Sequence, residues 1–316
     1  MPDATSQATA GRVGAHVVAE RAAFAQAFSA ASPFRHVVID DFFEPAFARQ
    51  LLAQFPAFEQ GNFLSEDGRP GSKSTCERIR ALGDGYAALD DMIRDQAFLR
   101  LLGDVTGIDD LRYDPWYLGG GTHENRHDGG LEAHVDFNFH PFERWQRRLN
   151  LIVYLNPEWQ EEWGGALELF RDPAAAPERV ITPVFNRCVI FETHGHSWHG
   201  FNHIVLPDDG HGRSRKSVAL YFYTPSTQEA QVPEAHSTVY VHPTLPAHLQ
   251  PGHVLDEQDV ASLRQLLGDR DNRIAMQYRE ISKLMTLVRA HERGFAGSML
   301  YAARRLQARL LRRSAG

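Results

Sequence analysis

The sequence predicts a mainly β protein with flanking helices (α+β). Its core would be a double-stranded β-helix (jelly-roll), preceded by N-terminal helices and followed by a helical C-terminal extension. Between Leu131 and Tyr223, short apolar runs alternate with turn residues, as strands do. This stretch lacks the helices of about 10–15 residues that separate the strands of a parallel sheet. Segments with helical periodicity flank it on both sides.

Three helices and one strand are expected before the core. The first helix spans Val13–Ala31 and ends before a Ser-Pro pair. Arg35–Phe43 is rich in β-branched residues and predicts a strand. The next helix opens at Glu44-Pro45, since proline is favoured in the first helical turn, and Gly83–Gly107 predicts the third.

The remaining elements are loops and short strands. Asn62–Lys73 is rich in Gly, Ser, Pro and charge, which predicts a surface loop, either a plain connector or a cover for a site. Leu149–Leu155 is almost wholly apolar and predicts a strand buried on both faces. The other expectations are an extended Asp109–Gly121, a tight turn at Gly164-Gly165, and loops over Asp172–Arg179 and Asp208–Ser214.

We divide the chain into a disordered N-terminus (1–12), a jelly-roll domain with its N-terminal helices (13–226), and a linker with a helical extension (227–316). In the extension Ile274, Tyr278, Ile281, Met285 and Val288 recur at helical steps and form an apolar seam. Such a seam predicts a helix that packs against another surface, and a homodimer is one way to cover it.

The tail 299–313 predicts a basic amphipathic helix, because leucines recur beside five arginines. Contact with an anionic membrane or partner is one interpretation. Packing on the core or on a dimer mate is the favoured one, because two turns of leucine make a small anchor.

Composition limits the class of protein. A hydrophobic fraction of 43% in 316 residues supports a buried core, and a net charge of −7 disfavours nucleic-acid binding. Cys76 and Cys188 lie far apart and predict reduced thiols. The N-terminus has no basic start and apolar run, and no stretch approaches the length of a membrane span, so we expect a cytoplasmic protein.

A candidate metal site begins at His134-Val135-Asp136. Residues two apart in a strand point the same way, so this imidazole and carboxylate could reach one ion. Two imidazoles and one carboxylate suit iron(II) and leave one face of the ion open. The second imidazole would come from a later strand, where four histidines compete: His194, His196, His199 and His203.

Arg215 is the candidate anion-binding residue. It opens a run in which Val218, Leu220 and Phe222 alternate with Ala219, Tyr221 and Tyr223, as strand residues do. An arginine that points inward needs an anion, and its rigid donor fork fits a carboxylate with two hydrogen bonds. A dicarboxylic cosubstrate would supply that group.

These residues together resemble the iron(II)/2-oxoglutarate-dependent dioxygenases, in their prolyl-4-hydroxylase-like branch. The likeness covers roughly Pro33 to Pro225 and includes the runs Arg148–Trp159, Trp163–Phe170 and Asn186–Thr193. Upstream, Pro33–Phe43, Tyr117–Gly121 and Gly129-Gly130 are also similar to family segments.

The resemblance implies a role for each matched residue. His134, Asp136 and His199 would bind iron, His199 being selected because the strand and turn before it have the family's length. Arg215 would bind the distal carboxylate of 2-oxoglutarate. The other expected cosubstrate residues are Tyr154, Ser217, Leu167, Asn150 and Tyr117, although this chain has more residues between Tyr117 and the first ligand than its relatives. The resemblance assigns no substrate-binding residue.

The implied reaction converts 2-oxoglutarate and dioxygen to succinate and carbon dioxide while an unactivated C–H bond is hydroxylated, with ascorbate as a reductant. Asp136 favours hydroxylation, because halogenating relatives lack this carboxylate. Prolyl residues, peptides or free amino acids are the first expected substrates, and small metabolites or sugar or lipid building blocks the second. A non-catalytic metal-containing jelly-roll binding protein is the rival of another class.

Overall fold

A computed structural model of the chain describes residues 9, 11–64, 70–143, 145–207, 212–225, 234–241, 245 and 248–293. The chain forms two compact units, Met1–Pro243 and Thr244–Gly316, each described by itself. The first unit therefore continues past the expected boundary at residue 226. The expected disordered N-terminus lies outside the described residues except for three positions.

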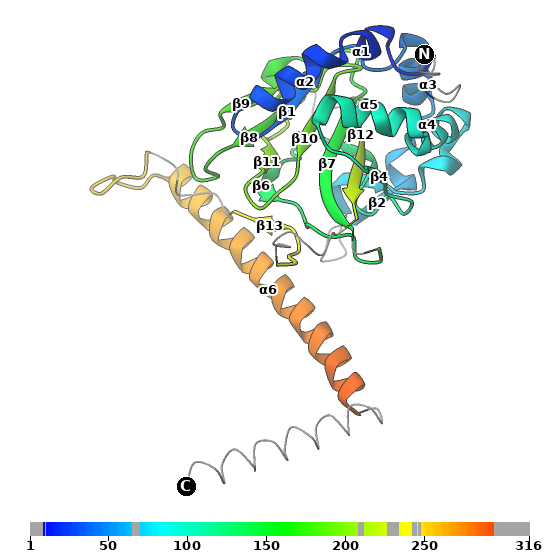
Figure 1. Cartoon of the computed structure of the whole chain (residues 1–316). Coiled ribbons are helices and arrows are strands. Elements are labelled where there is room, and N and C mark those ends of the chain that lie inside the picture. The colour runs from blue at the N-terminus through cyan, green and yellow to red at the C-terminus, as the bar shows by residue number, and fades with distance from the viewer. Residues whose placement is uncertain are drawn as a thin grey trace. The chain divides into compact units, whose positions relative to one another are not determined.

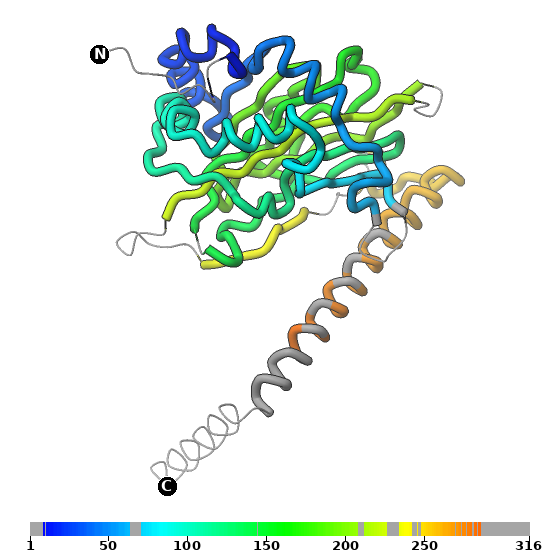
Figure 2. The backbone as a smooth tube through the Cα atoms, turned by 90° about the vertical axis from the view of Figure 1, so that its right-hand side faces the viewer, coloured from blue at the N-terminus to red at the C-terminus, as the bar shows by residue number. Residues whose placement is uncertain are grey.

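The first unit contains two antiparallel sheets (Figures 1 and 2), which confirms the mainly β prediction. The larger has the order β1-β10-β7-β12-β5-β3-β2, with β4 also paired to β12, and the smaller has the order β13-β6-β11-β8-β9. The larger comprises β1 (His36–Ile39), β2 (Asn62–Leu64), β3 (Pro70–Cys76), β4 (Arg112–Tyr113), β5 (Gly121–Asn125), β7 (Gln146–Tyr154), β10 (Cys188–Glu192) and β12 (Arg215–Thr224). The smaller comprises β6 (Leu131–Val135), β8 (Leu167–Phe170), β9 (Arg179–Ile181), β11 (Trp198–Phe201) and β13 (Val239–Tyr240).

Apolar side chains from both sheets pack between them. Tyr154 and Phe191 of the larger sheet form one buried cluster with Leu167 and Leu169 of the smaller. Elsewhere the same inner surfaces carry polar groups and enclose a cavity of about 230 Å³. The two sheets therefore act as the facing walls of both a core and a site.

Helices cover the outer face of the larger sheet (Figure 1), as predicted. They are α1 (Ala15–Ala19), α2 (Arg21–Ala30), α3 (Pro45–Ala53), α4 (Asp84–Arg94) and α5 (Gln96–Thr106), with short 3-10 turns at 58–60, 79–82 and 161–163. Val218 and Phe222 of β12 belong to the core under the helices, and Phe98 of α5 lies 6.3 Å from Phe222 between ring centroids. Ser217 and Ala219 of the same strand line the cavity. This alternation leaves β12 buried on both faces.

Two predicted helices are each divided in two. The helix expected over 13–31 breaks at Glu20, and the one expected over 83–107 breaks at Asp95. The Asp95 carboxylate accepts a hydrogen bond from the Ala97 amide at 3.1 Å, so it caps α5 instead of continuing α4.

The loop predicted over 62–73 is wrong in its described parts, which form the hairpin strands β2 and β3. Propensity alone disfavours strands in this Gly- and Ser-rich run. Pairing of β3 with β5 supplies the hydrogen bonds that stabilise it, with Lys73 opposite Asn125.

The second unit contains α6 (Glu257–Arg293), a helix that includes the seam residues predicted from the sequence. Its side chains at Ile274, Tyr278, Ile281 and Met285 are exposed, and the homodimer that would cover them stays a prediction. The basic tail at 299–313 lies outside the described residues. Within the described part of the chain, no helix has both the length and the apolar content that a membrane span requires.

Asn186 connects the turn before β10 to the segment that follows β1. Its backbone lies in the left-handed region at φ 60°, and its side chain is buried. Oδ1 accepts a hydrogen bond from the Phe43 amide at 3.0 Å, and Nδ2 donates to the Phe43 carbonyl at 2.8 Å. Asparagine suits this place because it tolerates the left-handed conformation and satisfies both backbone groups.

We expect Asn186→Ala to lower the free energy of unfolding by about 3 kcal/mol, from two lost hydrogen bonds and the left-handed strain of alanine. Urea denaturation monitored by circular dichroism measures it. Asn186→Gly removes the hydrogen bonds without the strain, so its loss should be smaller. Equal stability of Asn186→Ala and the parent chain would contradict this role.

Candidate functional site

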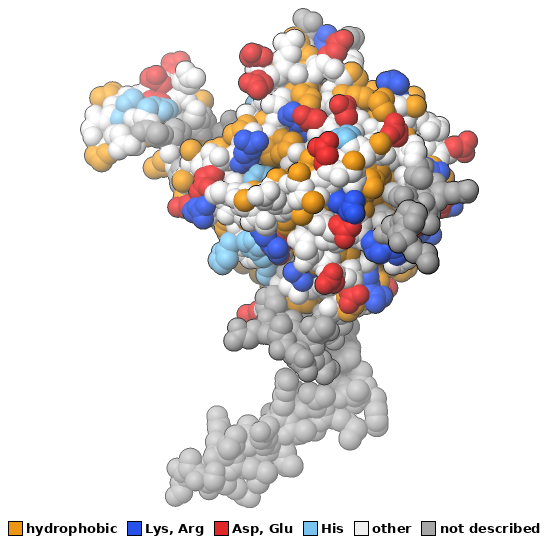
Figure 3. Space-filling model, turned by 45° about the horizontal axis from the view of Figure 1, so that its top comes forward, with side chains coloured by type: hydrophobic (Ala, Val, Ile, Leu, Met, Phe, Trp, Pro, Cys, Tyr) orange, Lys and Arg blue, Asp and Glu red, His pale blue; other side chains and the backbone are white. Residues whose placement is uncertain are grey.

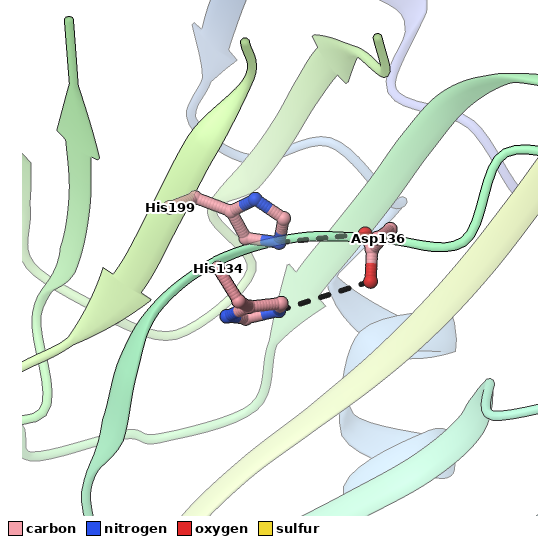
Figure 4. Close-up of side chains that lie close together, drawn as sticks. All are labelled: His134, Asp136 and His199. Atoms are coloured by element: carbon pink, nitrogen blue, oxygen red, sulfur yellow. Dashed lines mark ion pairs between the residues drawn. The ribbon is translucent and has the colours of Figure 1, made fainter. Parts of the chain in front are cut away.

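The predicted metal ligands converge at the inner side of the smaller sheet (Figure 4). His134 lies in β6 and His199 in β11, and the antiparallel register places the two residues directly opposite each other. Their ring centroids are 4.3 Å apart. Asp136 follows β6 immediately and turns its carboxylate toward both rings. Residues far apart in the sequence thus meet because two strands pair in this register.

The donor atoms are spaced for one ion. His134 Nε2 lies 3.7 Å from Asp136 Oδ1, and His199 Nε2 lies 3.5 Å from Oδ2. Metal–ligand bonds of about 2.1 Å place two ligands of one ion about 3–4 Å apart. These separations exceed a hydrogen bond and fall in that range, so the three side chains fit a shared metal.

Backbone carbonyls set the tautomer of both rings. His134 Nδ1 lies 2.9 Å from the Glu132 carbonyl oxygen, and His199 Nδ1 lies 2.9 Å from that of Ser197. A carbonyl only accepts, so each Nδ1 carries the hydrogen and each Nε2 keeps its lone pair toward Asp136. This is the usual support for a histidine that binds a metal.

Asp136 is held from the larger sheet by Arg147 and Asn150 of β7. Arg147 Nη2 donates to Oδ2 at 2.9 Å, and Asn150 Nδ2 donates to the same oxygen at 2.8 Å. Arg147 also donates to Asn150 Oδ1, and its guanidinium lies over the Tyr221 ring at 3.6 Å. Among the described residues no hydrogen bond reaches Oδ1, which leaves that oxygen for a metal.

The pKa shifts of the three side chains favour the protonation states that bind a metal: neutral imidazoles and a charged carboxylate. Burial lowers the pKa of His134 to about 4 and also lowers that of His199. Burial alone would raise the pKa of Asp136, but Arg147, the two rings and Asn150 outweigh it and hold that pKa well below its usual range. At neutral pH both rings are therefore neutral and the carboxylate is charged.

A second group in the other unit has the same residue types but a different geometry. His248 and His253 lie 2.7 and 2.6 Å from the two oxygens of Asp259. Those are hydrogen-bond lengths, shorter than the spacing of two ligands on one ion. The group serves as a polar cap at the start of α6, where Asp259 also exchanges hydrogen bonds with Asp256.

Arg215 lies at the other end of the same cavity and is buried. Nε donates to the Gly165 carbonyl at 2.6 Å, and Nη2 lies 3.4 Å from the Tyr154 hydroxyl. No carboxylate pairs with it among the described residues, and burial lowers its pKa. A buried guanidinium without a counter-ion is costly, so this end of the cavity fits an anionic cosubstrate.

The glycine pair predicted as a tight turn allows Arg215 its position. Both residues have φ of +67°, a conformation that side chains disfavour. A Cβ on Gly164 would lie 2.0 Å from the His203 carbonyl oxygen, and one on Gly165 would lie 3.0 Å from Arg215 Cδ. Only glycine lets the turn approach the guanidinium this closely.

The other expected cosubstrate residues fall into two groups. Ser217, Leu167 and Asn150 line the cavity, although the amide of Asn150 already serves Asp136 and Arg147. Tyr154 reaches the cavity through its contact with Arg215. Tyr117 does not line it: its buried hydroxyl donates to Asp90 at 2.7 Å in the core under the helices. Because its side chain points into that core, Tyr117 cannot contact a cosubstrate in the cavity.

The competing histidines lie away from the triad. His203 is exposed and bonds Asp128 at 3.1 Å, and the Nδ1 of His194 accepts the His196 amide. His123 does line the cavity, where its ring bonds the Gly119 carbonyl, and burial lowers its pKa to about 3. It is thus a neutral wall residue.

The lining residues that sequence reasoning missed include three with a charge or an aromatic ring near the site: Arg147, Lys73 and Tyr240. The sequence signal for Arg147 is weak: it lies three residues before Asn150 on a strand that becomes apolar only from Leu151 onward. Tyr240 stacks on the His134 ring at 5.2 Å because β13 pairs with β6. No local signal marks that pairing, since β13 is two residues long and exposed.

We predict that Arg147→Leu weakens metal binding about 10–100-fold, because Asp136 loses the donor that orients it. A calorimetric titration of the metal-free chain with iron(II) or nickel(II) measures the change in metal affinity. Arg148→Leu is the matched control, since the Arg148 guanidinium lies 3.6 Å from Glu192, away from the triad. Equal loss in both variants would show a general structural effect.

Comparisons with known proteins agree with this site. Residues 121–223 match the family model described as the 2OG-Fe(II) oxygenase superfamily. A stretch of 84 residues, 25% of this chain and 15% of the relative, is 32% identical to the prolyl 3-hydroxylase OGFOD1 of Mus musculus. The chain thus spans a small part of that protein.

Solved structures similar to the chain include two hydroxylases and a further protein. A prolyl hydroxylase from Trichoplax adhaerens is 15% identical, with 66% of this chain and 93% of that chain covered and a TM-score of 0.46. A Phytophthora capsici prolyl 4-hydroxylase is 19% identical, with 79% and 72% covered and a TM-score of 0.47. HygX from Streptomyces hygroscopicus, with nickel and 2-oxoglutarate bound, is 13% identical, with 65% and 91% covered and a TM-score of 0.42.

The matched family region contains the triad and Arg215, and the family description names the iron(II) and 2-oxoglutarate that these residues fit. The resemblance found in the sequence is therefore confirmed over the segment 121–223, which matches the model of the 2OG-Fe(II) oxygenase superfamily.

Proposed function

We propose that the chain is an iron(II)- and 2-oxoglutarate-dependent dioxygenase that hydroxylates an unactivated C–H bond. The substrate, 2-oxoglutarate and dioxygen would give the hydroxylated product, succinate and carbon dioxide. One oxygen atom enters the product and the other enters succinate. The observation that supports this most is that one cavity holds two groups at its two ends. One is Arg215, a buried arginine without a counter-ion among the described residues, and the other is the His-Asp-His triad.

Each end would have a separate task. His134, Asp136 and His199 would hold iron(II), which when bound supplies the activation of dioxygen. Arg215, with the Tyr154 hydroxyl beside it, would bind the distal carboxylate of 2-oxoglutarate and so fix the direction in which the cosubstrate enters. Leu167 and Ile152 give the cavity an apolar middle. Water excluded there strengthens each charged contact.

The substrate proposal is a prolyl residue, a peptide or a free amino acid, supported by the 32% identity to a prolyl 3-hydroxylase. A small metabolite or a sugar or lipid building block is the alternative. The rival is a metal-containing binding protein without catalysis. It does not explain why Arg215 is buried without a counter-ion among the described residues, because a structural metal needs no anion at the far end of the cavity.

A cytoplasmic location is part of the proposal. Cys76 and Cys188 are both free thiols, as expected in a reducing compartment. Nucleic acid is not proposed as a partner. On the face drawn in Figure 3, acidic and basic side chains are interspersed, without the single-sign field that a phosphate backbone attracts.

We expect His199→Ala to abolish oxygen-dependent formation of succinate from 2-oxoglutarate, because two remaining ligands hold the metal poorly. Succinate is assayed in the full chain with iron(II), under air and under nitrogen. His203→Ala is the control and should keep its activity, since that ring bonds only Asp128 in the described structure. Normal turnover in His199→Ala would assign the third ligand to another histidine.

Arg215→Leu should raise the 2-oxoglutarate concentration needed for half-maximal turnover about 100-fold, which corresponds to about 3 kcal/mol for a lost charged hydrogen-bond partner. Metal affinity should change little, because Arg215 lies at the opposite end of the cavity from the triad. Steady-state kinetics and metal titration of the same sample separate the two effects. An unchanged requirement would remove Arg215 from the cosubstrate site.

A further inference from the structure

The cavity has a chain-specific outer part. Among the residues that line it, Lys73, Gly119, Thr238 and Tyr240 lie outside the family-matched segment 121–223. Lys73 comes from β3 of the larger sheet and Tyr240 from β13 of the smaller, so they stand on facing walls. Features that select a substrate for this chain are expected in such residues, because the family segment already supplies the metal and cosubstrate ends.

Strand register directs Lys73 toward the cavity. In β3 it lies opposite Asn125 of β5, and Asn125 lies opposite Arg215 of β12. Residues opposite each other on neighbouring strands share a face of the sheet. Lys73 therefore points to the same side as Arg215, two strands away, which is about 10 Å across the sheet.

The charges of the cavity are unbalanced at Lys73. Its lining residues include three cations, Lys73, Arg147 and Arg215, but Asp136 is the one carboxylate among the described lining residues. Arg147 is committed to Asp136, and Arg215 is assigned to the cosubstrate. Lys73 has no ion-pair or hydrogen-bond partner among the described residues, and its side chain is exposed, so its ammonium group is open to a ligand that enters the cavity. An anion that enters the cavity would therefore meet a positive charge that is not already paired.

The facing wall is a fixed surface. Residues 234–241 run along β6: Asn138 Nδ2 donates to the Glu234 carbonyl at 2.8 Å, and the His236 amide donates to Asn138 Oδ1 at 2.9 Å. The Val241 amide donates to the Ala133 carbonyl at 2.9 Å. These contacts hold Tyr240 over the His134 ring at the edge of the cavity. A substrate group near the metal therefore meets an aromatic surface on one side and an ammonium on the other.

We propose that Lys73 is the counter-ion of an anionic group on the substrate, a carboxylate or a phosphate, with Tyr240 as the facing wall. The proposal rests on the proposed function and narrows it. The substrate would be a small acid, such as a free amino acid, or a chain end with a free carboxylate, and not an internal residue of a polypeptide.

The test measures binding, so it does not depend on turnover. The full chain is loaded with nickel(II), with and without 2-oxoglutarate, and titrated with L-proline, L-prolinamide, inorganic phosphate and, as a neutral reference, glycerol. We expect at least one probe with an acidic group to bind at least tenfold more tightly than its reference compound without that group. Lys73→Gln should abolish that preference, and Lys73→Arg should keep it within about threefold.

Lys216→Gln is the matched control. This lysine lies on β12, but its amine bonds Ser214 and it does not line the cavity. Its substitution should leave the preference intact. Which probe is preferred identifies the anion, a carboxylate if L-proline exceeds L-prolinamide and a phosphate if phosphate exceeds glycerol.

Three results would overturn the proposal: no preference for any anion, a preference that survives Lys73→Gln, or a fall in 2-oxoglutarate affinity in Lys73→Gln like that of Arg215→Leu. The last would assign Lys73 to the cosubstrate. Failure of the parent nickel-loaded chain to bind 2-oxoglutarate would instead contradict the proposed function. The titrations without 2-oxoglutarate still decide the role of Lys73 in that case.

Discussion

The register of β6 against β11 is the constraint on which the site depends. It places His134 opposite His199, and the turn out of β6 then brings Asp136 to both rings. Arg147 and Asn150 hold that carboxylate from the other sheet. A shift of one residue in either strand would turn one imidazole to the opposite face. The metal ligands thus depend on sheet pairing, while their orientation depends on the packing of one sheet against the other.

Two buried arginines divide the cavity by function. Arg147 has its counter-ion within the chain and serves to position Asp136. Arg215 has none among the described residues, and burial lowers its pKa. A folded protein tolerates a buried unpaired cation poorly, so its presence indicates that an anion from outside completes this end. Lys73 also has no partner among the described residues, and its place in the cavity lining leads from a cosubstrate to a substrate class.

The sequence was sufficient for the fold class and for the residues with a recognisable pattern. The alternation in β12 and the spacing of His134 and Asp136 are local signals, and the structure agrees with both. The break at Asp95 was missed because a single capping residue interrupts an otherwise helical run, and the break at Glu20 has no side-chain cap that would mark it. The β2–β3 hairpin was missed because its stability comes from pairing with β5.

The parts of the site that the sequence did not reveal come from tertiary contacts. Tyr240 reaches the cavity through an edge strand of two residues, and Lys73 reaches it through the register of three strands. Tyr117 was expected at the cosubstrate from its place in a matched segment, but its hydroxyl is held by Asp90 in the helical core. Whether each of these residues reaches the cavity depends on the direction of its side chain, and not on its position in a sequence motif.

The measurement that tests the central claim most directly is an anaerobic titration of the metal-free full chain, monitored by visible absorption. Iron(II) is added first and 2-oxoglutarate second. If the triad and Arg215 hold the two ligands together, a metal-to-ligand charge-transfer band should appear only when both are present. Absence of the band in folded protein that binds iron would mean that 2-oxoglutarate does not chelate the metal. That result would contradict the dioxygenase assignment.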